Sequence, residues 1–234
     1  MPPFLFKHFA ITQNRSALKV GTDAMLLGSF IQSENEIQGL DIGAGTGVLS
    51  LMVAQKNPSI HIDAIELDSE SSLDCQENFA HSNWSERLSM ISADFLAHEF
   101  DKKYDIIFSN PPFYQNTLVN ENKRTAVSKH AVHLPFELLF EKVSKLLTDE
   151  GAFWIIFPFD DFEKIGFLAK VTDFFIENQI TIESKPAVPN RMILSFRKVP
   201  TTINSKNFII RNKDNTFSNQ YIEMTKEFHG KNLI

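Results

Sequence analysis

Short apolar segments alternate with segments of helical periodicity through the middle of this 234-residue chain. Strand–helix–strand units of this kind build a mostly parallel sheet with helices on both faces. The alternation predicts seven strands, one ending at Ile42 and the others over residues 61–66, 88–92, 104–109, 151–158, 181–184 and 192–199. It predicts helices over residues 48–56, 69–82, 135–147 and 163–178. We therefore expect an α/β fold whose ligands bind at the carboxyl ends of the strands.

Three alternating glycines, Gly43, Gly45 and Gly47, follow the first predicted strand. Glycine lets the backbone turn sharply and approach a ligand closely. The spacing differs from the dinucleotide fingerprint G-x-G-x-x-G. Asp41, two residues before the first glycine, would repel a diphosphate and attract the ammonium group of a methionine moiety. The loop and Asp41 therefore predict a cofactor site, and the alternative is a tight turn without a ligand.

Acidic residues follow the next two predicted strands. Glu66 lies nineteen residues beyond Gly47, where nucleotide-binding folds place an acid against a ribose diol. Asp94 can accept a hydrogen bond from the adenine amino group of a cofactor, with Phe95 against the ring. The alternatives are a solvated acidic turn for Glu66 and Asp68, and a helix N-cap for Asp94. Ser69 is the predicted N-cap of the helix over residues 69–82.

The segment Asn110-Pro111-Pro112-Phe113 follows the fourth predicted strand. Methylation of an adenine amine requires its nitrogen to become tetrahedral, and two acceptors on its two hydrogens favour that change. The Asn110 side-chain oxygen and the Pro111 carbonyl can supply them from a backbone that two prolines fix. Phe113 offers a face for a base removed from its stack. The alternative is a rigid exit from a buried strand, with Phe113 in the core.

Together these motifs resemble the class I S-adenosylmethionine (SAM)-dependent methyltransferases that act on the amino group of adenine or of a glutamine amide. More specifically, the chain resembles the bacterial tRNA1(Val) adenine-N6 methyltransferase family, which modifies adenine 37 beside the anticodon. Two small departures are Asn14, where Asp is expected, and Phe113, where Tyr is common. The resemblance spans nearly the whole chain and includes residues 6–9, 13–15, 19–23, 26–28, 41–47, 64–67, Asn78, 110–113, Arg124, His130 and 189–191.

The resemblance implies a Rossmann-like class I methyltransferase fold with SAM as cofactor, S-adenosylhomocysteine as product and no metal. Residues 1–38 are expected to pack over the cofactor site, and residues 39–200 to form the methyltransferase domain. Residues 201–234 are expected to add a basic strand and helix to the same domain. The implied substrate is a tRNA, methylated at N6 of an adenine.

Further site residues follow from the same resemblance. Gly21 and Thr22 are expected over the methionine end of the cofactor, and Leu67 beside Glu66. For the loop over residues 21–23, the alternative is a helix start with Thr22 or Asp23 as N-cap. The residues expected to bind the tRNA are Lys7, Arg15, Arg124, Lys129, His130 and Arg191. Arg124, Lys129 and His130 are expected in the loop after the Asn-Pro-Pro-Phe segment, and the alternative for them is a solvated loop.

The net charge of −6 argues at first against a nucleic-acid partner, but the charges are unevenly distributed. Residues 1–20 carry three basic side chains and no acid, and residues 197–234 carry seven basic side chains and three acids. Such basic ends can bind a polyanion along one face, whereas the alternative is a solvated basic tail. The expected phosphate-binding cluster consists of Arg197, Lys198, Lys206, Arg211 and Lys213.

Cysteine usage and hydropathy bear on the compartment. Cys75 is the only cysteine, which excludes an intrachain disulfide and a cysteine-based zinc site. The sequence has no run of eighteen apolar residues and no charged segment followed by an apolar one at its start. We therefore expect a cytoplasmic monomer with no membrane contact.

Four other functions are alternatives to this one. A glutamine-amide N5 methyltransferase acting on a release factor would use the same acceptors, but it would carry a separate helical domain, and about 38 residues precede the first predicted strand. An N6-adenine methyltransferase acting on DNA would need a recognition domain, and another RNA is a further alternative substrate. The intact Asn-Pro-Pro-Phe segment disfavours a non-catalytic SAM-binding module.

Overall fold

A computed structural model describes residues 2–112 and 134–229. The strands are β1 (Phe4–Leu5), β2 (Ala10–Ile11), β3 (Gln38–Ile42), β4 (His61–Glu66), β5 (Leu88–Ser92), β6 (Tyr104–Ser109), β7 (Leu147–Pro158), β8 (Phe175–Lys185), β9 (Val188–Arg197) and β10 (Asn204–Ile209). The helices are α1 (Thr22–Phe30), α2 (Val48–Lys56), α3 (Ser69–Ala80), α5 (Phe136–Leu146), α6 (Phe162–Val171) and α7 (Asn219–Thr225), with 3₁₀ turns at Ser85–Arg87 and Phe159–Asp161. No helix within these ranges is long and apolar enough to span a bilayer.

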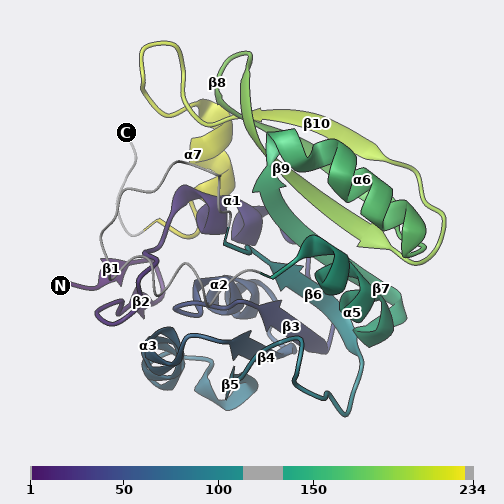
Figure 1. Ribbon diagram of the computed structural model, residues 1–234. Coiled ribbons are helices and arrows are strands. Elements are labelled where there is room, and N and C mark those ends of the chain that lie inside the picture. The colour runs from purple at the N-terminus through teal and green to yellow at the C-terminus, as the bar shows by residue number, and fades with distance from the viewer. Residues whose placement is uncertain (1, 113–133, 230–234) are drawn as a thin grey trace, which may run out of the picture.

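One large sheet runs through the molecule in the strand order β10-β8-β9-β7-β6-β3-β4-β5 (Figure 1). Strands β3 to β7 are mutually parallel, β9 is antiparallel to β7 and β8, and β10 is parallel to β8. The α/β prediction is confirmed, but the sheet has eight strands, so the predicted count of seven is wrong. The added strand, β10, is exposed over its first four residues and lacks the apolar run that marks a buried strand.

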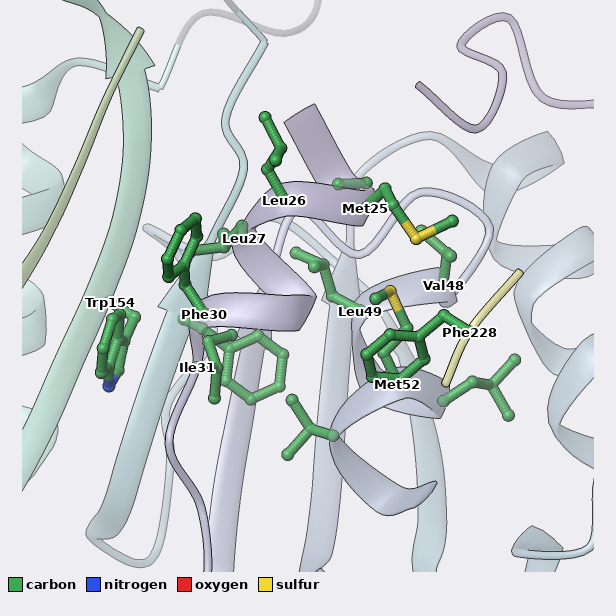
Figure 2. Packing of buried hydrophobic residues seen from close by; sticks show 14 of the residues in the cluster. Met25, Leu26, Leu27, Phe30, Ile31, Val48, Leu49, Met52, Trp154 and Phe228 are labelled. Atoms are coloured by element: carbon green, nitrogen blue, oxygen red, sulfur yellow. The ribbon is translucent and has the colours of Figure 1, made fainter. Parts of the chain in front are cut away.

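Both faces of the central strands are buried. In β6, Ile106 and Phe108 belong to one hydrophobic cluster, whereas Ile107 belongs to another, because successive strand side chains point to opposite faces. Helices α1, α2, α3 and α7 cover the first face, and α5 and α6 cover the second. Figure 2 shows apolar side chains of α1 and α2 meeting over the first face. Two-sided burial explains the continuous apolar sequence of these strands.

The segment after α6 departs from the prediction. A helix was expected up to residue 178, but α6 ends at Val171 and β8 begins at Phe175. Asp173 has a φ of 57°, a left-handed conformation that cannot continue the helix. In β8, buried Ile180 and Ile182 then alternate with partly exposed neighbours, which is the period of a strand.

Candidate active site

A pocket of about 640 Å³ lies where β3 and β6 end, a volume typical of small-ligand sites. Four parts of the chain line it: residues 18–24, residues 43–46, 48 and 49 of the glycine loop and the first turn of α2, residues 110–112, and a set from the last third of the chain. That last set is Ser184, Asn190, Ile210, Arg211, Phe217 and Tyr221.

The strand order fixes how these parts face one another. Strand β6, which Asn110 follows, lies between β3 on one side and β7, β9, β8 and β10 on the other. The glycine loop therefore flanks Asn110 on one side, and the residues after β8 and β10 lie on the other. The Ser109 hydroxyl donates to the Ile42 carbonyl oxygen over 2.8 Å, which ties the end of β6 to the start of the glycine loop.

The three loop glycines all have positive φ angles, of 70° at Gly43, 56° at Gly45 and 79° at Gly47. A Cβ atom at Gly43 or Gly45 would meet nothing within 4 Å, whereas one at Gly47 would lie 2.5 Å from Phe79 and 2.7 Å from Cys75. The first two glycines thus present bare backbone to open space in the pocket. The third lets the loop pack closely against α3.

Asp41 lies behind the glycine loop, with no exposed surface, and does not line the pocket. Its Oδ2 accepts hydrogen bonds from the Ser50 amide, at 3.1 Å, and the Ser50 hydroxyl, at 2.7 Å. Its Oδ1 is buried and has no hydrogen-bond partner among the described residues. Burial raises the pKa of Asp41 to about 7, against the opposing effect of Ser50. This oxygen can take a further donor.

Glu66, at the end of β4, holds the glycine loop in place. Its Oε2 accepts from the Gly45 amide at 2.8 Å and its Oε1 from the Asp68 amide at 2.9 Å. Burial raises its pKa. The Glu66 carboxylate can still accept hydrogen bonds from the hydroxyls of a ribose. Its contact with the ribose of a cofactor stays a prediction. The contact expected for Leu67, which is exposed, also stays a prediction.

The start of α3 corrects the predicted cap. The Asp68 side chain accepts from the Ser71 amide at 2.9 Å and is the N-cap, so the assignment of that cap to Ser69 is wrong. The β-region backbone of Asp68 places its carboxylate over the free amides of the first turn.

The residues after β5 stand apart from the pocket lining. Asp94 is exposed, and its Oδ1 accepts from the Leu96 amide at 2.8 Å, which stabilises a turn. Phe95 is 5% exposed and belongs to the core under α5, with the Lys142 ammonium 5.1 Å from its ring centroid. Contacts of Asp94 and Phe95 with a cofactor adenine stay predictions.

The loop before α1 forms one wall of the pocket. Gly21 is the N-cap of α1 without a side-chain hydrogen bond, so the capping role weighed for Thr22 or Asp23 is wrong. Gly21, Thr22 and Asp23 all line the pocket. The Asp23 Oδ2 lies 2.9 Å from the Arg191 Nε, in an ion pair that joins this wall to β9. Arg191, predicted to bind tRNA, is therefore engaged beside the pocket.

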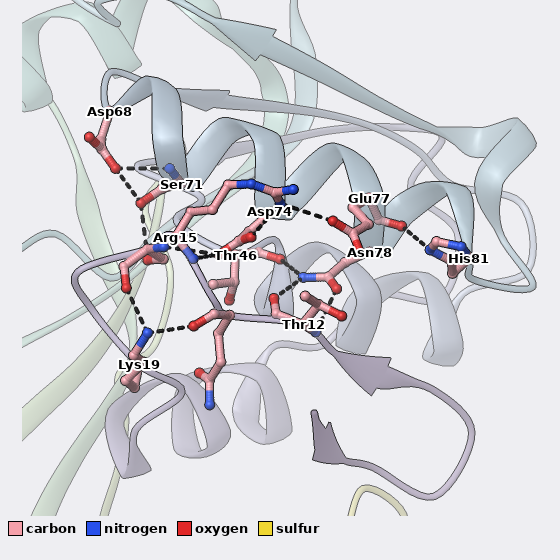
Figure 3. Close-up of polar contacts among 12 residues, drawn as sticks. Thr12, Arg15, Lys19, Thr46, Asp68, Ser71, Asp74, Glu77, Asn78 and His81 are labelled. Carbon is pink, nitrogen blue, oxygen red and sulfur yellow. Dashed lines mark hydrogen bonds and ion pairs between the residues drawn. The ribbon is translucent and has the colours of Figure 1, made fainter. Parts of the chain in front are cut away.

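Arg15 is bound to α3 (Figure 3). Its Nη1 lies 2.8 Å from the Asp74 Oδ1 and 2.9 Å from the Glu77 Oε2. The backbone amides of Arg15 and Ser16 donate to the Asp74 Oδ2. The Asp74 side chain is fully buried, so these donors compensate a desolvated carboxylate. Any phosphate at Arg15 would compete with these two acids.

Asn78 connects the same segment to the glycine loop. Its side-chain oxygen accepts from the Thr12 amide at 2.7 Å, and its amide group donates to the Thr12 and Thr46 carbonyl oxygens at 2.9 Å each. One side chain thus positions both the N-terminal segment and the loop (Figure 3).

Arg15→Ala is expected to lower the melting temperature much more than Lys7→Ala. Loss of Arg15 leaves the buried Asp74 carboxylate with backbone donors alone, whereas Lys7 forms an exposed pair with Glu227 that contributes little. Thermal unfolding of both variants measures the difference. Equal melting temperatures would show that the Arg15 contacts do not stabilise the fold.

The predicted basic cluster is not formed. Arg197 is the last residue of β9 and Lys198 follows it; this end of β9 lies at the amino ends of the parallel strands because β9 is antiparallel to β7. Lys206 lies within β10, and its ammonium group lies 4.6 Å from the ring centroid of Phe30 in α1. Arg211 and Lys213 follow β10 at the opposite edge, and of the five only Arg211 lines the pocket. The composition of the C-terminal segment gives no sign that β9 runs antiparallel to β7, which separates these basic residues.

Four of the predicted site residues, Phe113, Arg124, Lys129 and His130, lie outside the described residues. Sequence reasoning assigned no role at the pocket to Ser184, Asn190, Phe217 or Tyr221. Asn190 belongs to the resemblance over residues 189–191, and the other three belong to no recognisable motif. The aromatic character of Phe217 and Tyr221 was the signal available in the C-terminal segment.

The known proteins to which this chain is similar are methyltransferases. Residues 15–159 match the family described as methyltransferase small domain. A tRNA1(Val) (adenine(37)-N6)-methyltransferase of Bacteroides thetaiotaomicron is 32% identical over 230 residues, covering 97% of each chain. The protein of the same name from Flavobacterium johnsoniae is 34% identical, covering 97% of this chain and 99% of its own.

Solved structures share the fold at low sequence identity. A predicted O-methyltransferase from Agrobacterium tumefaciens superposes with a TM-score of 0.67 at 16% identity, over 88% of this chain and 96% of its own. A precorrin-6y C5,15-methyltransferase from Geobacter metallireducens gives 0.55 at 15% identity, over 82% and 94%. The predicted Rossmann-like methyltransferase fold is therefore confirmed.

Proposed function

Because this chain belongs to the methyltransferase small domain family and to the tRNA1(Val) (adenine(37)-N6)-methyltransferases, we propose that it methylates the N6 nitrogen of an adenine in tRNA, with SAM as methyl donor. The most specific form of the proposal is adenine 37, next to the anticodon of a valine tRNA. The observation that carries the proposal is that Asn110 and Pro111 line the same pocket as Gly43 and Gly45.

The residues around the glycine loop fit SAM. Gly43 and Gly45 leave open space where a side chain would otherwise stand, so a ligand can contact their backbone. The unpartnered Asp41 Oδ1 suits the ammonium group through a water. Glu66 would take the ribose hydroxyls, with Gly21 and Thr22 over the methionine end and Asp94 near the adenine. The product is S-adenosylhomocysteine, and no residue of the proposed site requires a metal.

Asn110 and Pro111 prepare the substrate amine. SAM supplies an electrophilic methyl group when it is bound. The Asn110 side-chain oxygen and the Pro111 carbonyl accept the two amino hydrogens of adenine, which favours a tetrahedral nitrogen with its lone pair free. Pro111 and Pro112 restrict the backbone, so the acceptors are placed before the substrate arrives. No strong base is needed, because the amino proton becomes acidic only as the methyl group transfers.

SAM affinity is expected to rise with pH up to about 7. Burial holds Asp41 protonated below that pH in the ligand-free protein, and pairing with an ammonium requires the carboxylate, so binding releases a proton there. The slope approaches about tenfold in Kd per pH unit well below 7. Calorimetry between pH 5.5 and 7.5 measures it, and Asp41→Asn should flatten the curve. An identical curve for that variant would remove Asp41 from the cofactor site.

The remaining parts of the proposal concern the whole protein. Residues 1–38 cover the cofactor side, residues 39–200 form the catalytic domain, and residues 201–234 complete it. Residues 18–24 in the pocket lining and the addition of β10 to the sheet support this division. We place the protein in the cytoplasm as a monomer with tRNA as its partner.

Transfer of a labelled methyl group from SAM tests the function against its alternatives. Purified enzyme is incubated separately with unmodified total tRNA, with total protein and with DNA. Label in tRNA, recovered as N6-methyladenosine after digestion, supports the proposal. Label in a glutamine amide would support the protein methyltransferase instead, and label in DNA the other adenine methyltransferase.

A further inference from the structure

We infer that Arg211, stacked on Phe217, binds one of the two phosphates that flank the target adenosine and thereby positions this nucleotide against Asn110. The inference rests on the proposed function and names a substrate contact within it. Arg211 would be a positioning residue for the tRNA, and it has no expected contact with SAM.

Arg211 begins a stack of three side chains in the pocket wall. The centre of its guanidinium lies 4.1 Å from the Phe217 ring centroid, and the Phe217 ring lies 4.6 Å from that of Tyr221 with an interplanar angle of 12°. Tyr221 is 4% exposed, and Phe217 packs on the core under α1 and α2. The buried Tyr221 and the packed Phe217 therefore hold the surface against which the guanidinium lies.

The loop that carries the stack is held by its own hydrogen bonds. The Arg211 Nη1 donates to the Asn215 carbonyl oxygen at 2.7 Å, and the Asn212 amide donates to the Thr216 carbonyl oxygen at 2.9 Å. The Arg211 amide donates to the Ser184 carbonyl oxygen at 3.2 Å, which anchors the loop to the end of β8. A guanidinium held in this way loses little conformational entropy when it binds an anion.

Among the charged side chains that line the pocket, Arg211 is the one best placed to bind an anion. Of the other charged lining residues, Asp23 forms an ion pair with Arg191, and the Lys19 ammonium donates to the backbone carbonyl oxygens of Gln13 and Ser16. No carboxylate in the described ranges pairs with Arg211. Only one of its five N–H groups is used by the Asn215 carbonyl, so a planar fork remains for a phosphate.

The sheet places Arg211 on the substrate side of the reacting centre. Asn110 lies between the glycine loop, on one flank, and the residues that follow β8 and β10, on the other. With the cofactor on the glycine loop, a nucleotide whose amine meets Asn110 extends toward Arg211. A nucleotide removed from its stack keeps both flanking phosphates near the mouth of the pocket.

The test compares Arg211→Gln with Lys213→Gln, a change of the same charge in an exposed part of the same loop. Arg211→Gln should lower kcat/KM for the tRNA by about 10- to 100-fold, mainly through KM, as expected for hydrogen bonds to a charged group. Lys213→Gln should change it less than threefold. Arg211→Lys should recover part of the loss. SAM affinity should match the wild type in all three variants, and the melting temperature should stay well above the assay temperature.

Phosphate neutralisation then identifies the contact. Ligated full-length tRNAs carry a methylphosphonate on either the 5′ or the 3′ side of the target adenosine. On one of these two tRNAs, kcat/KM of the wild type should fall by the same factor as kcat/KM of Arg211→Gln falls on normal tRNA. On that same modified tRNA, kcat/KM of Arg211→Gln should show no further decrease. Additive losses on both tRNAs, or equal kinetics for Arg211→Gln and Lys213→Gln, would overturn the inference.

Methyl transfer by the wild type to normal tRNA distinguishes a failure of the proposed function from a failure of the inference about Arg211. If wild type transfers no methyl group to adenine in tRNA, the proposed function fails, and the inference falls with it. If wild type is active and the Arg211 variants behave like the Lys213 control, only the inference fails.

Discussion

Asn110→Ala is expected to lower kcat for methyl transfer by at least about a hundredfold while leaving SAM affinity within about twofold of the wild type. The side chain supplies one of two pre-placed acceptors for the adenine amino hydrogens, and its loss removes an interaction that strengthens as the nitrogen becomes tetrahedral. Asn110 follows β6, and β3 separates β6 from β4, the strand that carries Glu66, which supports the glycine loop. The cofactor site should therefore persist.

The matched control is Asn207→Ala, which makes the same change on the exposed edge strand β10. Its kcat should equal that of the wild type. Single-turnover rates with saturating SAM separate the chemical step from product release for both variants. If Asn110→Ala kept most of its single-turnover rate, the proposed role of the Asn-Pro-Pro segment would be wrong.

Gly45→Ala and Gly47→Ala should fail in different ways. A methyl group at Gly45 points into open space of the pocket, so the fold loses only the cost of a left-handed alanine, about 1–2 kcal/mol. The same methyl group stands where a ligand would contact the backbone, and SAM affinity should fall by at least about tenfold. At Gly47 the added Cβ would lie 2.5 Å from Phe79 and 2.7 Å from Cys75, so the fold itself should be destabilised further.

Denaturant unfolding and calorimetry on both variants distinguish these effects. The expected pattern is weak SAM binding by a well-folded Gly45→Ala and a clearly lower unfolding free energy for Gly47→Ala. Undiminished SAM binding by Gly45→Ala would place the cofactor elsewhere in the pocket.

From β3 to β7, the order of the described strands and helices could be predicted because it depends on local patterns. The apolar run over residues 104–109 and the proline pair after it mark a buried strand and its end. Predicted helix 48–56 and strand 61–66 have the bounds of α2 and β4. The glycines could be assigned to one loop, since a turn after a strand leaves a local signature.

Other features depend on contacts between distant parts of the chain. Spacing treats Gly45 and Gly47 alike, and only the approach of α3 gives them different roles. Arg15 resembles a free phosphate ligand until α3 brings Asp74 against it. The Arg211–Phe217 stack forms because β10 pairs with β8 at the edge of the sheet. The largely polar sequence of β10 does not mark it as a strand of that sheet.

The most direct test of the proposed function is the position of the methyl group in the product. Unmodified tRNA1(Val) is incubated with SAM and wild-type enzyme, digested to oligonucleotides and sequenced by mass spectrometry, with Asn110→Ala as the matched reaction. We expect one additional methyl group on N6 of the adenine next to the anticodon with wild type, and none with the variant. Methyl groups on another base, or an unmodified tRNA beside a methylated protein glutamine, would contradict the proposed function.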